Sequence, residues 1–304
     1  MENRKRSEII RKLSSYFLTL QIGENIPSIR SMSKTFNASI GLLSESISEI
    51  ETADGVVLDK RGQLGTFIQK MSVGKLWQIA ATEPFVIAHT LPSNHRYEGL
   101  ATALKILLSE SGVETYFIFI RGSRTRINAL REKRCHVAII SQFAANGLCT
   151  HKERTAMTLP PCTFTSAHHL YLTKDLTKNQ SGLKVAVDPD SYDQHNLSKI
   201  EFEGADVNYQ HINFMNIYRY LTTGEVDAAI WTADDMAPHL NASVIEQSLS
   251  EHTRKIVNNS DTQAALIYDV NNPLVKEVLQ KVINTERAIK IQQEVIDGKR
   301  IPAY

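Results

Sequence analysis

The 304-residue sequence contains few cysteines, no long apolar segment and almost no excess of charge of either sign. Its three cysteines, Cys135, Cys149 and Cys162, form no Cys-x-x-Cys pair, and an odd number argues against a disulfide framework. No segment approaches the roughly 18 apolar residues of a membrane span, and the charged N-terminus is not followed by an apolar run of signal-peptide length. These absences predict a soluble protein in the reducing cytoplasm, with no membrane partner.

Signatures of enzymes and cofactors are also missing. The sequence has no P-loop, no dinucleotide fingerprint and no nucleophile elbow, and its isolated cysteines lack histidines at metal-ligand spacing. The side chains of His168–His169 would point to opposite faces of a strand, which indicates packing rather than a metal site. The carboxylate pairs Glu201/Glu203 and Asp234/Asp235 lie in polar turns, and we interpret them as solvated. We therefore expect no enzyme activity, no catalytic residue, no cofactor and no metal.

Residues 1–70 are predicted to form three helices followed by a hairpin with a basic turn. Apolar residues recur every three or four positions in the first helix, as on one face of a helix. Ser28 is placed to cap the second helix, which Asn37 ends, and Ser39 is placed to cap the third. The expected helices span 7–20, 28–36 and 40–52, and the expected strands span 56–59 and 65–68.

Four segments in this part resemble, in order, the winged helix of GntR-family regulators. They are Gly23–Arg30, Phe36–Ser39, Ile50–Val57 and Arg61–Ile68. The resemblance implies that the third helix enters the DNA major groove and that the hairpin touches the flanking backbone. The serine-capped helix starts can present N–H groups to phosphates. The residues expected to contact DNA are Ser28, Arg30, Ser39, Gly41, Ser44, Lys60 and Arg61.

The charge of this domain departs from the family pattern. The third helix contains no lysine or arginine, and residues 1–70 hold ten basic against eight acidic side chains, a net charge of +2. The whole chain carries only +1, so DNA binding would depend on a local patch of phosphate contacts. The alternative is a degenerate domain that is kept for dimerisation.

From Leu76 onward, strands alternate with helices, which predicts parallel sheets with crossover helices. A pseudo-repeat indicates two lobes: Ala129–Ile140 lies 91 residues before Tyr220–Trp231, and each is a helix end, a polar turn and a buried strand. We place lobe I at about 75–165 and 245–304, and lobe II at about 166–244. The expected strands are 76–88, 115–120, 137–141, 168–173, 184–187, 207–211 and 228–232, and the expected helices are 97–110, 125–132, 193–201, 214–222 and 273–291.

This part resembles the type 2 periplasmic-binding-protein fold, as in the effector domains of LysR-family regulators. The resemblance rests on the repeat and on Ala264–Tyr268, a strand that in this fold returns to the first lobe. It implies a ligand in the cleft between the lobes, at strand ends and helix starts. The Gly122–Ser123 turn suits a carboxylate or phosphate, with which Arg121 or Arg124 would pair. The candidate ligand-binding residues are His89, Ser93, Arg121, Gly122, Ser123, Arg124, Ser141, Gln142, Asp188, Tyr192, Asn213 and Thr232.

The two parts together resemble the YhfZ family of enterobacterial proteins. We predict a winged helix-turn-helix domain at residues 1–70 and a two-lobed α/β domain at 71–304 that senses a small, anionic or polar metabolite. The protein would act as a homodimeric transcription regulator that binds DNA. Two alternatives remain open: an enzyme on the two-lobed fold, and a protein-interaction module whose winged helix only dimerises.

Overall fold

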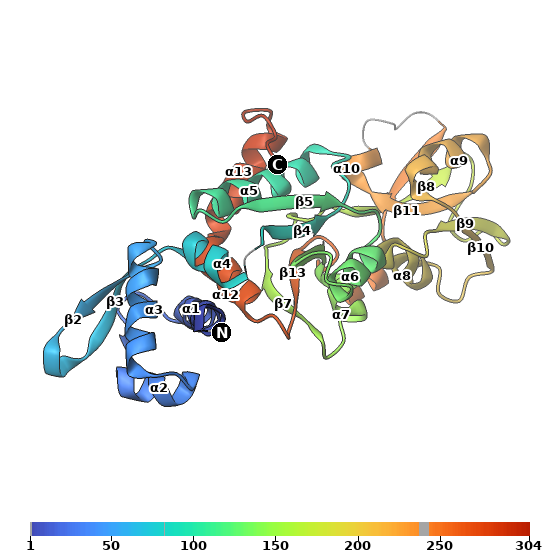
Figure 1. The fold of residues 1–304 in the computed structure, drawn as a ribbon. Helices are drawn as coiled ribbons and strands as arrows, with labels where there is room; N and C mark the ends of the chain where they lie inside the picture. Colours follow the sequence, from blue (N-terminus) through green and yellow to red (C-terminus); the bar gives the residue numbers. More distant parts are fainter. Residues whose placement is uncertain (1, 82, 237–242) are drawn as a thin grey trace. The chain divides into compact units, whose positions relative to one another are not determined.

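The computed structural model describes residues 2–81, 83–236 and 243–304 (Figure 1). The chain forms two compact units. Unit 1 comprises Met1–Val86, Leu104–Tyr116 and Asn272–Asn284, and unit 2 comprises Ile87–Ala103, Phe117–Asn271 and Thr285–Tyr304. No helix among the described residues is long and apolar enough to cross a membrane.

The N-terminal part of unit 1 has the predicted order of three helices and a hairpin. Ser28 and Ser39 cap the second and third helices as predicted, because their hydroxyls accept hydrogen bonds from the N–H groups of Ser31 and Leu42. Asn37 ends the second helix in the left-handed conformation. The helices are α1 (Glu2–Thr19), α2 (Ile29–Phe36) and α3 (Ile40–Thr52), and the strands are β1 (Asn25–Ile26), β2 (Val56–Lys60) and β3 (Thr66–Met71), in the sheet order β1-β3-β2, with the turn η1 (Gly62–Leu64) at the hairpin tip.

Two further helices belong to unit 1, and one of them corrects a prediction. Residues up to 81 of the predicted strand 76–88 are helical, in α4 (Val73–Ala81), and only its end is a strand, β4 (Phe85–His89). Leu76 and Trp77 are buried because α4 packs against α1 and against α12 (Leu274–Val282), which comes from the far end of the chain. The segment 69–76, around the predicted boundary between the two domains, is therefore the end of β3 and the start of α4.

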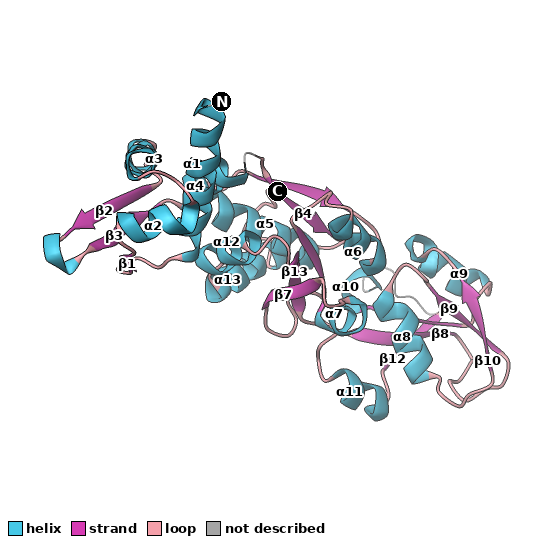
Figure 2. Cartoon of the chain, turned by 60° about the horizontal axis from the view of Figure 1, so that its bottom comes forward, coloured by secondary structure: helices cyan, strands magenta, loops and turns pink. Residues whose placement is uncertain are grey.

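Most of unit 2 forms two lobes, each built on a five-stranded sheet (Figure 2), and the first two residues of β4 (Phe85–His89) and of β5 (Thr115–Phe119) in the first sheet belong to unit 1. The sheet of lobe I has the order β5-β4-β6-β13-β7, and the sheet of lobe II has the order β10-β9-β11-β8-β12. The strands are β5 (Thr115–Phe119), β6 (Val137–Ser141), β7 (Glu153–Thr158) and β13 (Ala264–Asp269) with β4 in lobe I, and β8 (His168–Thr173), β9 (Leu183–Val187), β10 (Val207–His211), β11 (Ala228–Thr232) and β12 (Val244–Ser248) in lobe II. The late strand β13 returns to the first sheet, as the resemblance implied.

Helices follow the strands in both lobes. Lobe I carries α5 (His95–Glu110), α6 (Ser123–Arg131), α7 (Gln142–Leu148) and α13 (Thr285–Ile296), and lobe II carries α8 (Tyr192–Glu201), η2 (Phe214–Asn216), α9 (Ile217–Thr223), α10 (Ala233–Met236) and α11 (Glu251–Val257). In lobe II both faces of the sheet are covered. Leu170, Val185 and Ile230 are buried in one core, and Tyr171 and Ala229 are buried in another.

The sheets are mixed, which corrects the prediction of parallel sheets. β13 runs antiparallel to β6 and β7, and β8 runs antiparallel to β11 and β12. Both strands follow a passage of the chain between the lobes, so the parallel order that a βαβ crossover imposes does not apply to them. The predicted helix 273–291 is two helices, α12 and α13. Sequence reasoning missed β12, whose residues are mostly exposed at the sheet edge, and also β7, α7, α10 and α11.

Candidate DNA-binding surface and ligand cleft

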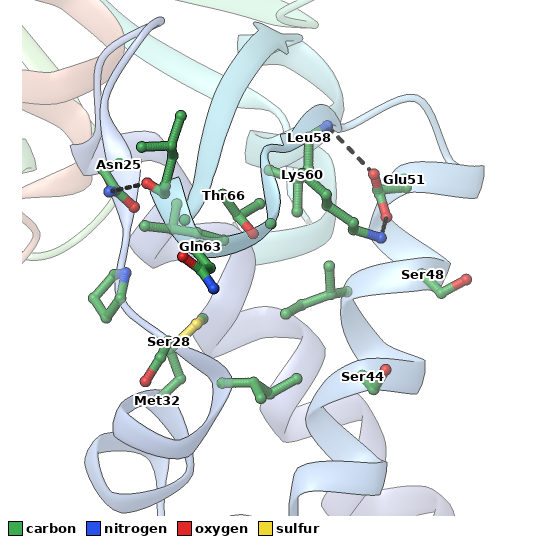
Figure 3. Close-up of a pocket in the computed structure, with 17 residues that line it drawn as sticks. Asn25, Ser28, Met32, Ser44, Ser48, Glu51, Leu58, Lys60, Gln63 and Thr66 are labelled. Atoms are coloured by element: carbon green, nitrogen blue, oxygen red, sulfur yellow. Dashed lines mark hydrogen bonds and ion pairs between the residues drawn. The ribbon is translucent and has the colours of Figure 1, made fainter.

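A groove with a volume of about 850 Å³ lies between α2, α3 and the hairpin (Figure 3). Ile26, Met32 and Ile47 are buried residues of its lining. Its exposed polar lining consists of Asn25, Ser28, Ser44, Ser48, Lys60 and Gln63. Three of the residues predicted to contact DNA, Ser28, Ser44 and Lys60, therefore share one concave surface.

The exposed basic residues near this groove differ in their partners. Lys60 lies 3.7 Å from a carboxylate oxygen of Glu51, and Arg61 lies 2.7 Å from one of Asp59. The exposed Arg30 forms no ion pair with any described residue. Surface pairs contribute about 0–1 kcal/mol, so phosphates can compete for Lys60 and Arg61.

The exposed face of α3 carries small and acidic side chains. Gly41, Ser44 and Glu45 are exposed, and a Cβ atom at Gly41 would meet nothing within 4 Å. The guanidinium of Arg6, on α1, lies 2.8 Å from Glu49 and 3.9 Å from Glu45. Arg6 thus offsets the acidity of α3. Sequence reasoning missed it because the interaction spans 43 residues.

The second candidate site is a cavity of about 70 Å³ between the two lobes of unit 2. Five of the predicted ligand-binding residues line it: Ser93, Arg121, Gly122, Ser123 and Thr232. A cavity of this size holds about two waters at roughly 30 Å³ each, whereas ligand sites usually measure about 300–1,000 Å³. The lobes are therefore closed on each other in this structure.

Donors on lobe I and aspartates on lobe II hold the cleft closed. Arg121 binds both Asp188 and Asp190, the latter at 2.5 Å. The Ser141 hydroxyl donates to Asp193 at 2.5 Å. Three further interactions of this kind are present. Arg96 lies 3.0 Å from Asp234, and the Ser93 hydroxyl and the Asn94 amide donate to Asp235 at 2.8 and 2.7 Å.

Tyr192, at the start of α8, packs onto lobe I. Its backbone N–H donates to the Ser123 hydroxyl at 3.0 Å. Its ring lies 5.4 Å from the Phe143 ring, centre to centre, and 5.4 Å from the Arg124 guanidinium. A Cβ atom at Gly147 would lie 1.9 Å from the Tyr192 hydroxyl oxygen, so only glycine leaves room for this packing.

Seven of the predicted residues do not line the cavity. Arg124, Ser141, Asp188 and Tyr192 instead form the contacts between the lobes that are described above, and the other three lie elsewhere. His89 is fully buried, and burial lowers its pKa to about 4, so the ring is neutral. Gln142 bonds to Asn146 and Thr158 within lobe I, and Asn213 caps η2.

The interpretation of three carboxylates as solvated is wrong. Asp234 and Asp235 are held by lobe I, and the Glu201 side chain is buried and bonded by Lys178, Ser250 and Thr253. Their local sequence is polar, but tertiary packing covers them. Glu203 is exposed, as predicted.

Sequence reasoning also missed Tyr97, Arg126, His168, Asp193 and Trp231, all of which line the cavity. His168 pairs with the buried Asp261 at 2.8 Å, and its pKa is raised because this partner outweighs the effect of burial. Asp193 lies in the first turn of α8, the helix that follows the buried strand β9. A carboxylate at a helix start beyond a buried strand is the sequence signal that could have identified it as a candidate ligand-binding residue.

Comparisons with known proteins confirm this organisation. The protein-family model of the YhfZ C-terminal domain matches residues 73–304, and a model of a helix-turn-helix domain matches residues 21–68. The chain belongs to the YhfZ family. The protein named uncharacterized protein YhfZ from Escherichia coli K12 is 25% identical to this family member over 302 residues, which cover 99% of this chain and 98% of that protein.

Solved structures show the same fold. The crystal structure of YhfZ from Shigella flexneri matches with a TM-score of 0.62 and 26% identity, over 73% of this chain and 93% of that one. A substrate-binding protein of an amino acid ABC transporter, AbpA from Streptococcus pneumoniae, matches with a TM-score of 0.50 and 17% identity over 72% and 94% of the two chains. The prediction of a helix-turn-helix domain before a two-lobed, binding-protein-like domain is confirmed. The more specific resemblance of the N-terminal domain to the winged helix of GntR-family regulators stays a prediction.

Proposed function

We propose that this YhfZ family member is a DNA-binding transcription regulator whose two-lobed domain senses a small, polar metabolite in the cytoplasm. The observation that carries the proposal is the groove between α2, α3 and the hairpin, which brings Ser28, Ser44 and Lys60 together in a domain that matches a helix-turn-helix model. Helix α3 would enter the major groove, and the hairpin would contact phosphates.

The mechanism is a shift between two states of the two-lobed domain. Closed lobes share a set of hydrogen bonds between lobe I donors and lobe II aspartates, and a ligand that binds better to this state increases its population. In a dimer, closure would change the spacing of two helix-turn-helix domains. Binding of ligand and of DNA would then be coupled, and each would change the affinity for the other by the same factor.

Replacing basic side chains near the groove should weaken DNA binding across sequences. We expect Arg30→Ala and Lys60→Ala/Arg61→Ala to reduce the salt dependence of binding, by a slope of about 1 for each phosphate that the variant no longer binds. The double variant should be the weaker binder because it also leaves Glu51 and Asp59 without their cations. Fluorescence anisotropy, with DNA from upstream of the operon that encodes the protein, measures the affinity and its salt dependence. The control is Lys255→Ala, which changes an exposed lysine of α11. Unchanged affinity in both variants would remove these residues from the DNA interface.

The regulator should act as a dimer on a two-fold site. A single recognition helix reads few base pairs, and paired half-sites about 34–36 Å apart, or multiples of that distance, are the usual geometry. Analytical ultracentrifugation at micromolar concentration should show two chains per complex with DNA. A monomer with and without DNA would reject this assembly.

A further inference from the structure

Some of the charged side chains around the interlobe cavity form ion pairs and others do not. Arg121 is paired with Asp188 and Asp190, and Arg96 is paired with Asp234. Three charged residues that line the cavity form no ion pair within the described part of the chain: Arg126, Asp193 and Asp235.

Arg126 provides lobe I with a buried positive charge. The side chain belongs to a residue that is only 3% exposed, and it donates to two backbone carbonyl oxygens, at 2.7 Å from Ile139 and 2.8 Å from Ile120. Burial lowers its pKa to about 10, so the guanidinium is still charged at neutral pH. The negative charge of Asp193 acts on Arg126 but does not form an ion pair with it. Because a buried charge without a direct partner is costly, an anionic group in the cavity would compensate Arg126.

Asp193 and Asp235 provide lobe II with the opposite charge. Asp193 is 4% exposed, and both carboxylates accept hydrogen bonds only from neutral donors: Ser141 for Asp193, and Ser93 and Asn94 for Asp235. Burial raises the pKa of both, although the nearby His168, which is paired with Asp261, acts in the opposite direction. The Oε1 atom of Gln194, a cavity-lining residue that is 8% exposed, is buried without a hydrogen-bond partner. On this side of the cavity, the two carboxylates therefore have only neutral donors, and the Gln194 oxygen has none.

We propose that the cavity binds a small zwitterion, an α-amino acid or a close analogue, with its carboxylate on Arg126 and its ammonium group on Asp193 and Asp235. An ammonium group supplies three donors, which matches two carboxylates and the Gln194 oxygen. The two ends of the ligand bind to different lobes, so the bound ligand stabilises the closed state. This inference rests on the proposed sensory function and names the chemical class of its ligand.

Other ligand classes fit these groups less well. A phosphate or dicarboxylate would bring a second negative charge toward Asp193 and Asp235. Among residues 2–81, 83–236 and 243–304, no group of three histidine, cysteine or acidic side chains is arranged to hold a metal ion. The volume of about 70 Å³ also favours a compact molecule, although the lobes must open to admit it.

The test is isothermal titration of the full-length protein with the twenty protein amino acids. For each amino acid that binds, the matched probes are the amine without the carboxylate and the carboxylic acid without the amine; inorganic phosphate is a further probe. We expect one or a few amino acids to bind, and each one-charge analogue to bind at least 10-fold more weakly. Binding of none of the twenty, or equal binding of an acid analogue or of phosphate, would overturn the proposal.

Isosteric variants locate the site. Asp193→Asn and Asp235→Asn should each weaken amino-acid binding at least 10-fold, whereas Glu203→Gln, the same change on an exposed residue after α8, should have no effect. Circular dichroism confirms that each variant is folded, and unchanged affinity in both Asp variants contradicts the proposal. Fluorescence anisotropy with DNA tests the proposed regulatory function separately from the proposed ligand class. Amino-acid binding without DNA binding contradicts the regulator and leaves the ligand class standing, whereas DNA binding that responds only to an anion contradicts the ligand class alone.

Discussion

Replacing Gly147 with alanine should hold the lobes apart and weaken binding of any cleft ligand about 5- to 150-fold. The new Cβ would lie 1.9 Å from the hydroxyl oxygen and 2.1 Å from the adjacent ring carbon of Tyr192, so this ring would have to leave its place in the closed state. Overpacking of this kind costs about 1–3 kcal/mol, and the cost falls on the closed state alone. Alanine is also a better helix former than glycine, so α7 itself should not be weakened.

Hydrogen exchange at the residue-192 amide measures this closure directly, because its N–H bonds to Ser123 across the cleft. The exchange should be faster in Gly147→Ala than in the wild type. The double variant Gly147→Ala/Tyr192→Ala removes the clash, so its residue-192 amide should exchange no faster than that of Tyr192→Ala alone. The effects of the two substitutions would then be non-additive. If the Gly147→Ala protein keeps wild-type exchange and affinity, the lobes do not close through this packing.

Replacing Arg131 with methionine should lower the free energy of unfolding by about 2–3 kcal/mol at neutral pH. The Glu153 side chain is only 3% exposed and lies 2.9 Å from the Arg131 guanidinium. Burial acts to raise the pKa of Glu153, but the hydrogen bonds from Arg131 and Thr150 outweigh it and lower the pKa to about 2. Without Arg131, the carboxylate would be buried without its counter-ion.

The pH dependence of this loss has a definite sign. The folded-state pKa of Glu153 lies below its ordinary value of 4.5, so the pair stabilises the fold above that pH and loses this contribution as the pH falls toward 2. Urea unfolding at several pH values should therefore show the difference between wild type and Arg131→Met shrinking below about pH 4.5. Arg134→Met, which removes a largely exposed pair with Glu132, is the control and should change stability by less than about 0.5 kcal/mol. A loss of the same size at every pH would contradict the role of this pair.

Local sequence predicted the helix-turn-helix domain well. The cap residues Ser28 and Ser39 act on N–H groups three positions away, and the third helix has the predicted bounds. Strands such as β6 and β11 were also predicted correctly, because each is a short, mostly buried run with few polar residues. These features depend on neighbours within a few positions along the chain.

Prediction failed where distant parts of the chain decide the structure. The segment 76–81 is apolar enough for a strand, but it is a helix because α1 and α12 provide a surface for its buried face. The direction of β13 depends on where the chain re-enters lobe I, which no local pattern encodes. In both cases the local preference was ambiguous, and packing against remote elements selected one outcome.

The sequence by itself determined that this chain joins a helix-turn-helix domain to a two-lobed domain, and it placed Ser93, Arg121, Gly122, Ser123 and Thr232 around the cavity. Only the tertiary structure decided which charges there are paired. The interactions that settle it, Ser141 with Asp193, Arg96 with Asp234 and Ser93 with Asp235, span 52, 138 and 142 residues. A carboxylate in a polar turn is solvated or buried according to what the opposite lobe places over it, and that is a property of the closed fold rather than of the turn.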